Sequence, residues 1–122
     1  TRETAMARFK ALKAGENFHD LDPELKMTYS NADRTQNTIY MRLKYNEPSG
    51  TVVNVRKSMW IHPELDRAIS IREAARLQTF PDTFIFEGTK DSQYQQVGNA
   101  VPPYLAKAIA DSVISILNNA TE

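Results

Sequence analysis

The chain contains no cysteine among its 122 residues. This absence excludes a disulfide framework, a thiolate zinc site and a cysteine nucleophile within the chain. Histidine is almost as scarce, because only His19 and His62 occur, far apart and without the clustered spacing of metal ligands. We therefore expect no bound metal ion.

Long apolar runs are also missing from the sequence. No stretch approaches the roughly 18 apolar residues of a membrane-spanning helix, so we expect no membrane association. The N-terminus, Thr1-Arg2-Glu3-Thr4, has neither an initiator methionine nor the charged-then-apolar pattern of a signal peptide. We expect the chain to begin inside a longer polypeptide or after removal of a tag, and its composition is compatible with the cytosol.

The length suits about one small domain with a single modest core. Hydrophobic residues make up 41% and charged residues 25%, as in ordinary globular proteins. The formal charge is zero but uneven, since residues 1–60 hold ten basic and seven acidic residues whereas residues 61–122 hold five and eight. This imbalance would suit a basic face for DNA phosphates, but on charge alone ordinary surface charge with a chance imbalance is the favoured explanation.

Residue patterns in the first half predict both kinds of secondary structure, and hence a mixed α+β chain. Apolar residues at helical spacing predict a helix over residues 5–12, which Gly15 is placed to end. Residues 38–45 alternate like a half-buried strand, and the β-branched residues 51–55 predict a second one. The face of the first strand that we expect to be buried consists of Ile39, Met41, Leu43 and Tyr45.

The second half predicts two helices. Ser70 and Glu73 form a potential capping box, and the helix that follows should stop before Pro81. Pro102 and Pro103 suit the start of a second helix. That helix carries an apolar stripe, Leu105, Ile109, Val113 and Leu117, which requires a partner surface. Part of this partner is expected to lie outside the chain.

Two sequence blocks carry the strongest functional signal. Residues 70–82 read SIREAARLQTFPD, and residues 95–103 read QQVGNAVPP. In this order and at this short separation, they resemble the ninth and tenth conserved motifs of DNA cytosine-5 methyltransferases, and residues 48–58 resemble the approach to the ninth motif in bacterial members. The resemblance implies a cytoplasmic, bacterial-type enzyme that transfers a methyl group from S-adenosylmethionine to carbon 5 of cytosine in double-stranded DNA.

The resemblance also implies a division of the chain. Residues 1–90 would form a small target-recognition lobe that includes the ninth motif. Residues 91–122 would hold the tenth motif and a C-terminal helix that completes the α/β catalytic lobe of the intact enzyme. The missing catalytic lobe, in the same enzyme or in a separate subunit, is therefore an expected partner besides DNA.

The residues singled out in the ninth-motif block are expected to be structural. Arg72 and Arg76 lie four apart, on one helix face, where each would pair with a carboxylate such as Asp82 or reach a phosphate. We interpret Ser70 and Glu73 as caps. Glu73 is not interpreted as a general base, because no nucleophile or partner acid lies near it in sequence.

The tenth-motif block has a more direct functional interpretation. Gly98 can adopt a backbone conformation closed to other residues, and its lack of a side chain permits close approach. Asn99 offers both donors and an acceptor to a ligand. By resemblance, Asn99 and Ala100 would contact S-adenosylmethionine at the edge of the large domain. The alternative is a helix followed by a turn in which Asn99 caps locally.

Two groups of polar residues are candidates for DNA contact. They are Arg34, Gln36 and Asn37 before the first expected strand, and Arg56, Lys57 and Ser58 after the second. Arg, Asn and Gln can read base edges, while Lys and Ser more often hold phosphates. The alternative for each is a solvated side chain. The aromatic residues Tyr29, Tyr40, Tyr45 and Trp60 are assigned to the core.

The family's remaining motifs are absent from the chain. They are the glycine loop for the cofactor, the Pro-Cys pair with the nucleophile, and the Glu-Asn-Val acid motif. The implied mechanism needs a thiolate to attack a cytosine flipped out of the duplex, so the chain alone is predicted to be inactive. Two alternatives remain: a non-catalytic module that reads DNA through a helix-turn-helix, and a specificity subunit of a split enzyme.

Overall fold

Helices dominate the computed structural model, which describes all residues except 1, 31 and 121–122. In chain order the helices are α1 (Glu3–Ala11), η1 (Phe18–Asp20), α2 (Pro23–Lys26), η2 (Ala32–Arg34), α3 (Val55–Ser58), α4 (Ile71–Leu77), α5 (Lys90–Asn99) and α6 (Pro103–Ala120). Within the described residues there is no strand, only the isolated bridges Arg42–Ile61 and Ile61–Ala68. The predicted helices are confirmed, and the two strands predicted for a mixed α+β fold are not formed.

Residues 39–43 show why the first predicted strand does not form. Tyr40 N–H donates to Ser58 O at 2.8 Å, Arg42 N–H to Glu16 O at 2.9 Å and Leu43 N–H to Ile61 O at 3.1 Å. A strand requires a ladder of successive bridges to a neighbour, whereas this segment forms only the isolated bridge Arg42–Ile61. Tyr40 also has a φ of 51°, which breaks the extended path. The segment is therefore a connector between two parts of the chain.

The connector is covered on both sides. Tyr40 belongs to one buried cluster, while Met41 and Leu43 pack against the other. Tyr45, by contrast, is 68% exposed, so its assignment to the core is wrong. A single buried face was expected from the alternating pattern, but Ile39 packs against the same core as Tyr40, whereas Met41 and Leu43 pack against the other.

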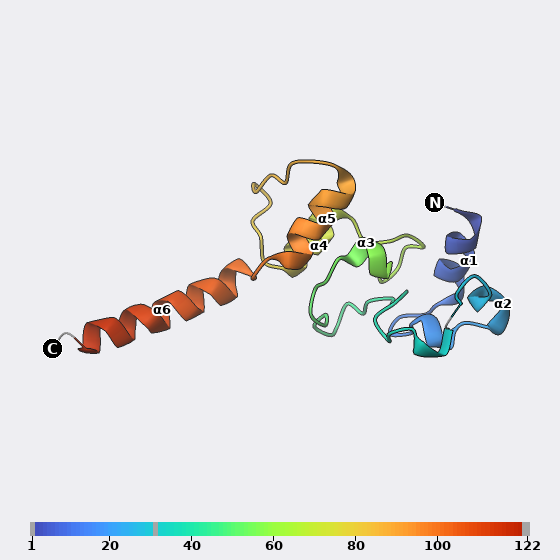
Figure 1. The fold of residues 1–122 in the computed structure, drawn as a ribbon, viewed down its shortest axis with the longest axis horizontal. Helices are drawn as coiled ribbons and strands as arrows, with labels where there is room; N and C mark the ends of the chain where they lie inside the picture. The colour runs from blue at the N-terminus through green and yellow to red at the C-terminus, as the bar shows by residue number, and fades with distance from the viewer. Residues whose placement is uncertain (1, 31, 121–122) are drawn as a thin grey trace.

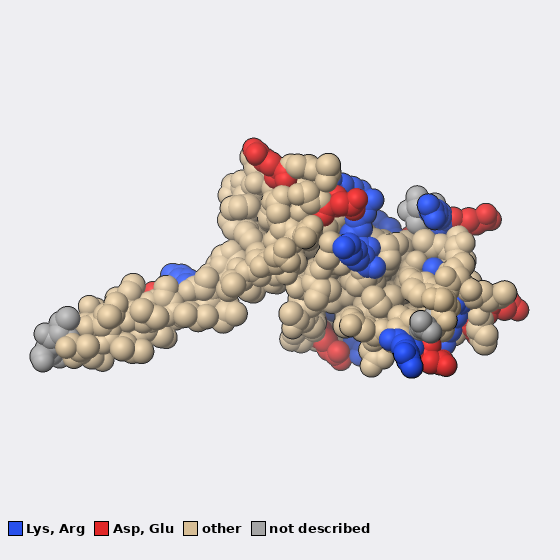
Figure 2. Space-filling model, viewed as in Figure 1, with Lys and Arg blue, Asp and Glu red and all other residues tan. Residues whose placement is uncertain are grey.

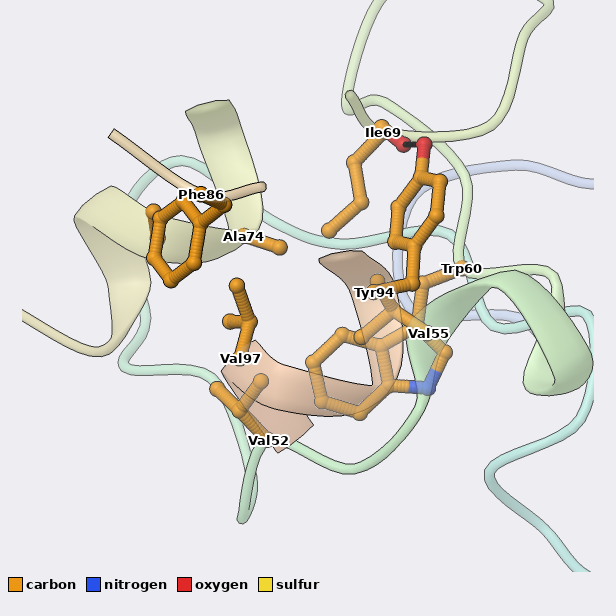
Figure 3. Close-up of a cluster of buried hydrophobic side chains, with 9 residues drawn as sticks. Val52, Val55, Trp60, Ile69, Ala74, Phe86, Tyr94 and Val97 are labelled. Atoms are coloured by element: carbon orange, nitrogen blue, oxygen red, sulfur yellow. Dashed lines mark hydrogen bonds between the residues drawn. The ribbon is translucent and has the colours of Figure 1, made fainter. Parts of the chain in front are cut away.

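The larger core joins α3, α4 and α5 (Figure 3). It contains Val52, Val55, Trp60, Ile69, Ala74, Ala75, Phe86, Tyr94 and Val97. Trp60 is fully buried, and its indole N–H donates to Thr38 O at 2.9 Å. The Tyr94 hydroxyl donates to Ile69 O at 2.8 Å. These bonds satisfy the polar ends of the large aromatic side chains and fix α5 against the rest of the fold.

The smaller core lies near the N-terminus and is organised around two buried arginines. Its apolar members are Phe9, Leu12, Phe18, Leu21, Tyr40 and Ile61. Arg42 is 5% exposed; it donates to Leu12 O at 2.6 Å and His62 O at 2.7 Å, and pairs with Asp66 at 2.8 Å. Arg8, also 5% exposed, donates to Leu25 O at 2.8 Å. Two of the ten basic residues in residues 1–60 are therefore unavailable to DNA.

Helix α6 projects away from both cores (Figure 1). Its large apolar side chains are exposed, namely Leu105, Ile109, Val113, Ile114, Ile116 and Leu117. In the view of Figure 2 most of the helix carries no charge. By length and hydropathy, the helical run Lys90–Ala120 is apolar enough to cross a membrane, which was not expected from the sequence. None of its most apolar window is buried. One such helix is weak evidence for a membrane.

Candidate functional site

Helix α4 begins with the expected capping box. Glu73 N–H donates to Ser70 Oγ at 3.1 Å, and Ser70 N–H donates to Glu73 Oε1 at 2.7 Å. The Glu73 carboxylate also accepts two bonds from the Arg67 guanidinium, at 2.7 and 3.1 Å. The bonds from Arg67 first, and then those from Ser70, lower the pKa of Glu73 from 4.5 to about 2. Glu73 is thus a cap and an ion-pair partner.

The lowered pKa of Glu73 predicts a loss of stability in acid. The stabilisation is fully present above pH 4.5, the carboxyl's ordinary value, and is lost as the pH falls towards 2. Allowing for solvent screening, the loss should be roughly 2 kcal/mol of unfolding free energy. Urea unfolding at pH 6 and pH 2.5 should show a steeper decline for the native chain than for Glu73→Gln. Equal declines in the two proteins would contradict the assignment.

Arg72 and Arg76 hold the loop that follows α4. Arg76 forms two bonds of 2.9 Å with the Asp82 carboxylate, the partner expected from the sequence. Arg72 donates to Pro81 O at 3.3 Å and to Phe84 O at 2.7 Å. In this arrangement, both guanidinium groups bind loop atoms and serve the structural role predicted for them.

Gly98 lies where α5 crosses the chain just before α3. A Cβ atom at Gly98 would lie 2.6 Å from Val53 C and 2.7 Å from Asn54 N, closer than real side-chain atoms approach. The expected close approach is therefore present. The expected unusual backbone conformation is not, because Gly98 is helical and its φ is not positive. Glycine is required here by space rather than by conformation.

Asn99 ends α5 at the surface. Its side chain is exposed and takes part in no hydrogen bond with the described residues. Ala100, which follows it, adopts an extended conformation and donates its N–H to Val97 O at 3.3 Å. Asn99 therefore does not form the local cap that was the alternative interpretation. Its side-chain amide is available to bind a ligand.

The candidate DNA-contacting groups lie on adjoining segments. Tyr40 N–H donates to Ser58 O, and the Trp60 indole donates to Thr38 O, so residues 38–40 run beside residues 58–60. At the ends of these segments, one group comprises Arg34, Gln36 and Asn37, all exposed, and the other comprises the exposed residues Arg56 and Lys57. The fold therefore places residues 38–40, which follow the first group, against residues 58–60, which follow the second.

Two of the candidate DNA-contacting residues, Ser58 and Arg56, have partners within the fold. Ser58 is 5% exposed, and its hydroxyl donates to Asn54 O at 3.3 Å inside the turn of α3. Its prediction as a DNA contact is therefore wrong, because the side chain points into the fold. Arg56 pairs with Asp91 at the start of α5, at 2.9 Å, so a phosphate would compete with this carboxylate.

Residues 41–50, His62, Pro63 and α4 line an open cavity of about 420 Å³. Neither Asn99 nor Ala100 lines it, so the cavity is separate from the expected cofactor contact. Among the residues that the structure describes, no group of three or more His, Asp or Glu side chains is arranged to hold a metal ion.

Gln78 and Thr79, at the end of α4, were not predicted from the sequence as functional residues. Gln78 bonds to Val97 and Ala100 at the end of α5, and Thr79 bonds to Tyr104 in the first turn of α6. Their only sequence signal was membership of the first block, because residues 19 to 25 positions away supply their partners.

Comparisons with known proteins agree with the two motif blocks. The family model described as C-5 cytosine-specific DNA methylase matches residues 3–115. The type II methyltransferase M1.HphI of Haemophilus parahaemolyticus is 37% identical over 94% of this chain and 37% of its own length. M.DdeI of Desulfomicrobium norvegicum is 37% identical over 87% of this chain and 29% of its own length. M.AgeI of Thalassovita gelatinovora is 48% identical over 61% of this chain and 18% of its own length.

The chain thus spans between 18% and 37% of the length of these curated relatives. The match of the family model extends from α1 into α6 and includes both sequence blocks and the exposed Asn99. The chain belongs to the C-5 cytosine-specific DNA methylase family.

Proposed function

We propose that this chain is the C-terminal part of a DNA (cytosine-5)-methyltransferase. It contributes target recognition and part of the S-adenosylmethionine site, and it is inactive without the rest of the enzyme. Residues 1–90 serve recognition and include the ninth motif, and residues 91–122 hold the tenth motif and the helix that joins the catalytic lobe. This assignment divides the chain by function, since α5 itself packs on α3 and α4.

The uncovered apolar face of α6 is the observation that carries this proposal. Ile109 and Val113 on this face are 53% and 48% exposed. In proteins, most of the stability of a helix comes from packing such a face against another surface. The opposite side of α6 carries the ion pair of Lys107 and Asp111, at 2.9 Å. A helix with one polar and one apolar side suits docking on a protein surface better than crossing a bilayer. The missing catalytic lobe supplies that surface.

The cofactor contact is assigned to Asn99 and Ala100. The exposed Asn99 amide has two donors and an acceptor to offer, and Gly98 holds the end of α5 against the backbone of residues 53–54. S-adenosylmethionine presents hydroxyl, amine and carboxylate groups that such an amide can bind. Asn99 is thus proposed to bind the cofactor and to take no part in the chemical step.

DNA contact is assigned to Arg34, Gln36, Asn37, Arg56 and Lys57. These exposed residues stand on two adjoining segments, as a surface that follows a DNA backbone and groove would require. In the absence of DNA, the ion pair with Asp91 holds the Arg56 guanidinium at the surface. To bind a phosphate, Arg56 would have to break this ion pair. The proposed setting of the enzyme is the cytoplasm of a bacterial-type cell.

Substitution of Asn99 tests the cofactor contact. The assay uses the assembled enzyme, which denotes this chain together with a polypeptide that carries the remaining family motifs. Asn99→Ala should raise the KM for S-adenosylmethionine about tenfold, because one or two hydrogen bonds to the cofactor are lost. The KM for DNA should stay within about twofold of the native value. An unchanged KM for the cofactor would favour a purely structural role for Asn99.

The alternative of an independent DNA-binding module makes a different prediction. Such a module would bind a specific DNA sequence without a partner, and S-adenosylmethionine would not alter the binding. Fluorescence anisotropy with the chain alone, over DNA of many sequences, separates the two. The methyltransferase proposal expects only weak, salt-sensitive binding by the chain alone, because a small number of basic contacts is available.

A further inference from the structure

The end of α4 faces the segment that carries Asn99. Gln78 closes α4 and is 5% exposed. Its side-chain amide donates to Val97 O at 3.0 Å and to Ala100 O at 3.1 Å. These two acceptors stand on either side of Gly98 and Asn99. One buried side chain thus spans the turn at which α5 ends.

Thr79 makes a second bond to the same part of the chain. Its hydroxyl oxygen accepts the N–H of Tyr104, in the first turn of α6, at 3.2 Å. Thr79 has a φ of 65°, in the left-handed region that a β-branched residue rarely enters. Such a conformation persists only where surrounding contacts enforce it. Together, Gln78 and Thr79 hold the link between α5 and α6 at both of its ends.

The side chain of Gln78 is not needed to finish its own helix. The backbone N–H of Gln78 already donates to Ala74 O at 3.1 Å, and the next two N–H groups bond to Arg76 O and Ala75 O at 3.0 Å each. Both donors of the side-chain amide therefore serve the distant segment. Apart from them, the turn is held by one longer backbone bond, from Ala100 N–H to Val97 O at 3.3 Å.

We propose that Gln78 and Thr79 are positioning residues for the cofactor contact. Gln78 fixes the Asn99 turn at the end of α5, and Thr79 fixes the start of α6 relative to that turn. The inference rests on the proposed contact between Asn99 and S-adenosylmethionine. It adds a physical link from the ninth-motif helix, which supports the recognition part, to the cofactor-binding segment. Correct placement of the recognition part would thereby favour cofactor binding.

Hydrogen–deuterium exchange on this chain tests the positioning without any cofactor. Gln78→Met keeps the side-chain volume and removes both donors, so amide exchange over residues 98–104 should rise about tenfold. Exchange in α3 should change little. The matched control is Gln93→Met, because the Gln93 amide donates to Gly88 O at the opposite end of α5. Unchanged exchange over residues 98–104 in Gln78→Met would overturn the inference.

Kinetics in the assembled enzyme test the consequence for the cofactor. Gln78→Met should raise the KM for S-adenosylmethionine about tenfold and leave kcat within about twofold. Thr79→Val, which removes the acceptor and keeps the shape, should act in the same direction, and Thr79→Ser should restore the native KM. Thr79→Val also provides the test if Gln78→Met does not fold.

The inference and the proposed function fail in different ways. If Asn99→Ala raises the KM for S-adenosylmethionine while Gln78→Met and Thr79→Val do not, the positioning role is wrong and the cofactor contact stands. If Asn99→Ala itself leaves the KM unchanged, the proposed cofactor contact fails and the inference falls with it. A fall in kcat with an unchanged KM in Gln78→Met also overturns the inference, because positioning for binding acts on KM.

Discussion

Gly98→Ala should lower the free energy of unfolding by about 3 kcal/mol, as expected when an added methyl group meets rigid neighbours. The new Cβ would lie 2.6 Å from Val53 C, 2.7 Å from Asn54 N and 2.8 Å from Val53 O. All three are backbone atoms, so no side chain can rotate away to make room. Either α5 moves off the segment before α3 or the larger core loosens. Urea unfolding followed by circular dichroism measures the change.

Gly50→Ala is the matched control for this substitution. A Cβ at Gly50 meets no atom within 4 Å, and its φ is not positive. Its stability should therefore change by less than about 0.5 kcal/mol, or rise slightly because the unfolded chain loses freedom. If Gly98→Ala were as harmless as Gly50→Ala, α5 would not pack directly on the backbone of residues 53–54.

Ile109→Asp should reduce methyl transfer by the assembled enzyme at least about a hundredfold, since docking would bury a charge where an apolar side chain belongs. Ile109 lies in the middle of the exposed apolar face of α6 and is 53% exposed in this chain. Because Ile109 is exposed in the chain alone, the substitution should change the chain's own free energy of unfolding by less than about 0.5 kcal/mol. Methylation assays at several concentrations of the catalytic polypeptide should show weaker association of the two parts.

Ser115→Asp provides the control on the polar side of the same helix. Ser115 is exposed, four residues from Asp111 and away from the apolar face that contains Ile109. The substitution introduces the same charge and should leave methyl transfer within about twofold of the native value. Equal losses from Ile109→Asp and Ser115→Asp would mean that the apolar face of α6 is not the docking surface.

Local signals explain which elements the sequence could predict. The capping box of Ser70 and Glu73 needs only residues three apart, and Pro103 at the start of α6 needs only its own fixed φ. Both predictions are confirmed. The predicted pairing of Arg76 with Asp82 is also local, since the two residues are only six positions apart.

Non-local pairing explains where the predictions failed. Residues 38–45 alternate like a strand, yet whether a strand forms depends on a continuous neighbour elsewhere in the chain. Here Arg42 bonds to Glu16 on one side and Leu43 to Ile61 on the other. The positive φ of Tyr40 has no signature in the sequence either. The alternating pattern therefore predicted one buried face of a strand, whereas the segment packs against two separate cores.

The candidate site shows the same limit. Composition gave ten basic residues in residues 1–60, but it could not reveal that Arg8 and Arg42 are buried and donate hydrogen bonds inside the fold. Ser58 was chosen because it follows Arg56 and Lys57, and the turn of α3 directs it inwards. Gln78 and Thr79 escaped notice because the acceptor or donor for each lies in another part of the chain.

The most direct measurement is methyl transfer from radiolabelled S-adenosylmethionine to DNA by three samples: this chain, a polypeptide carrying the missing family motifs, and their mixture. We predict no transfer by this chain, because it has no cysteine to attack the cytosine ring, and transfer by the mixture at carbon 5 of cytosine. The Ile109→Asp mixture should be inactive or nearly so. Transfer by this chain alone, or association of the two parts without any transfer, would contradict the proposed function.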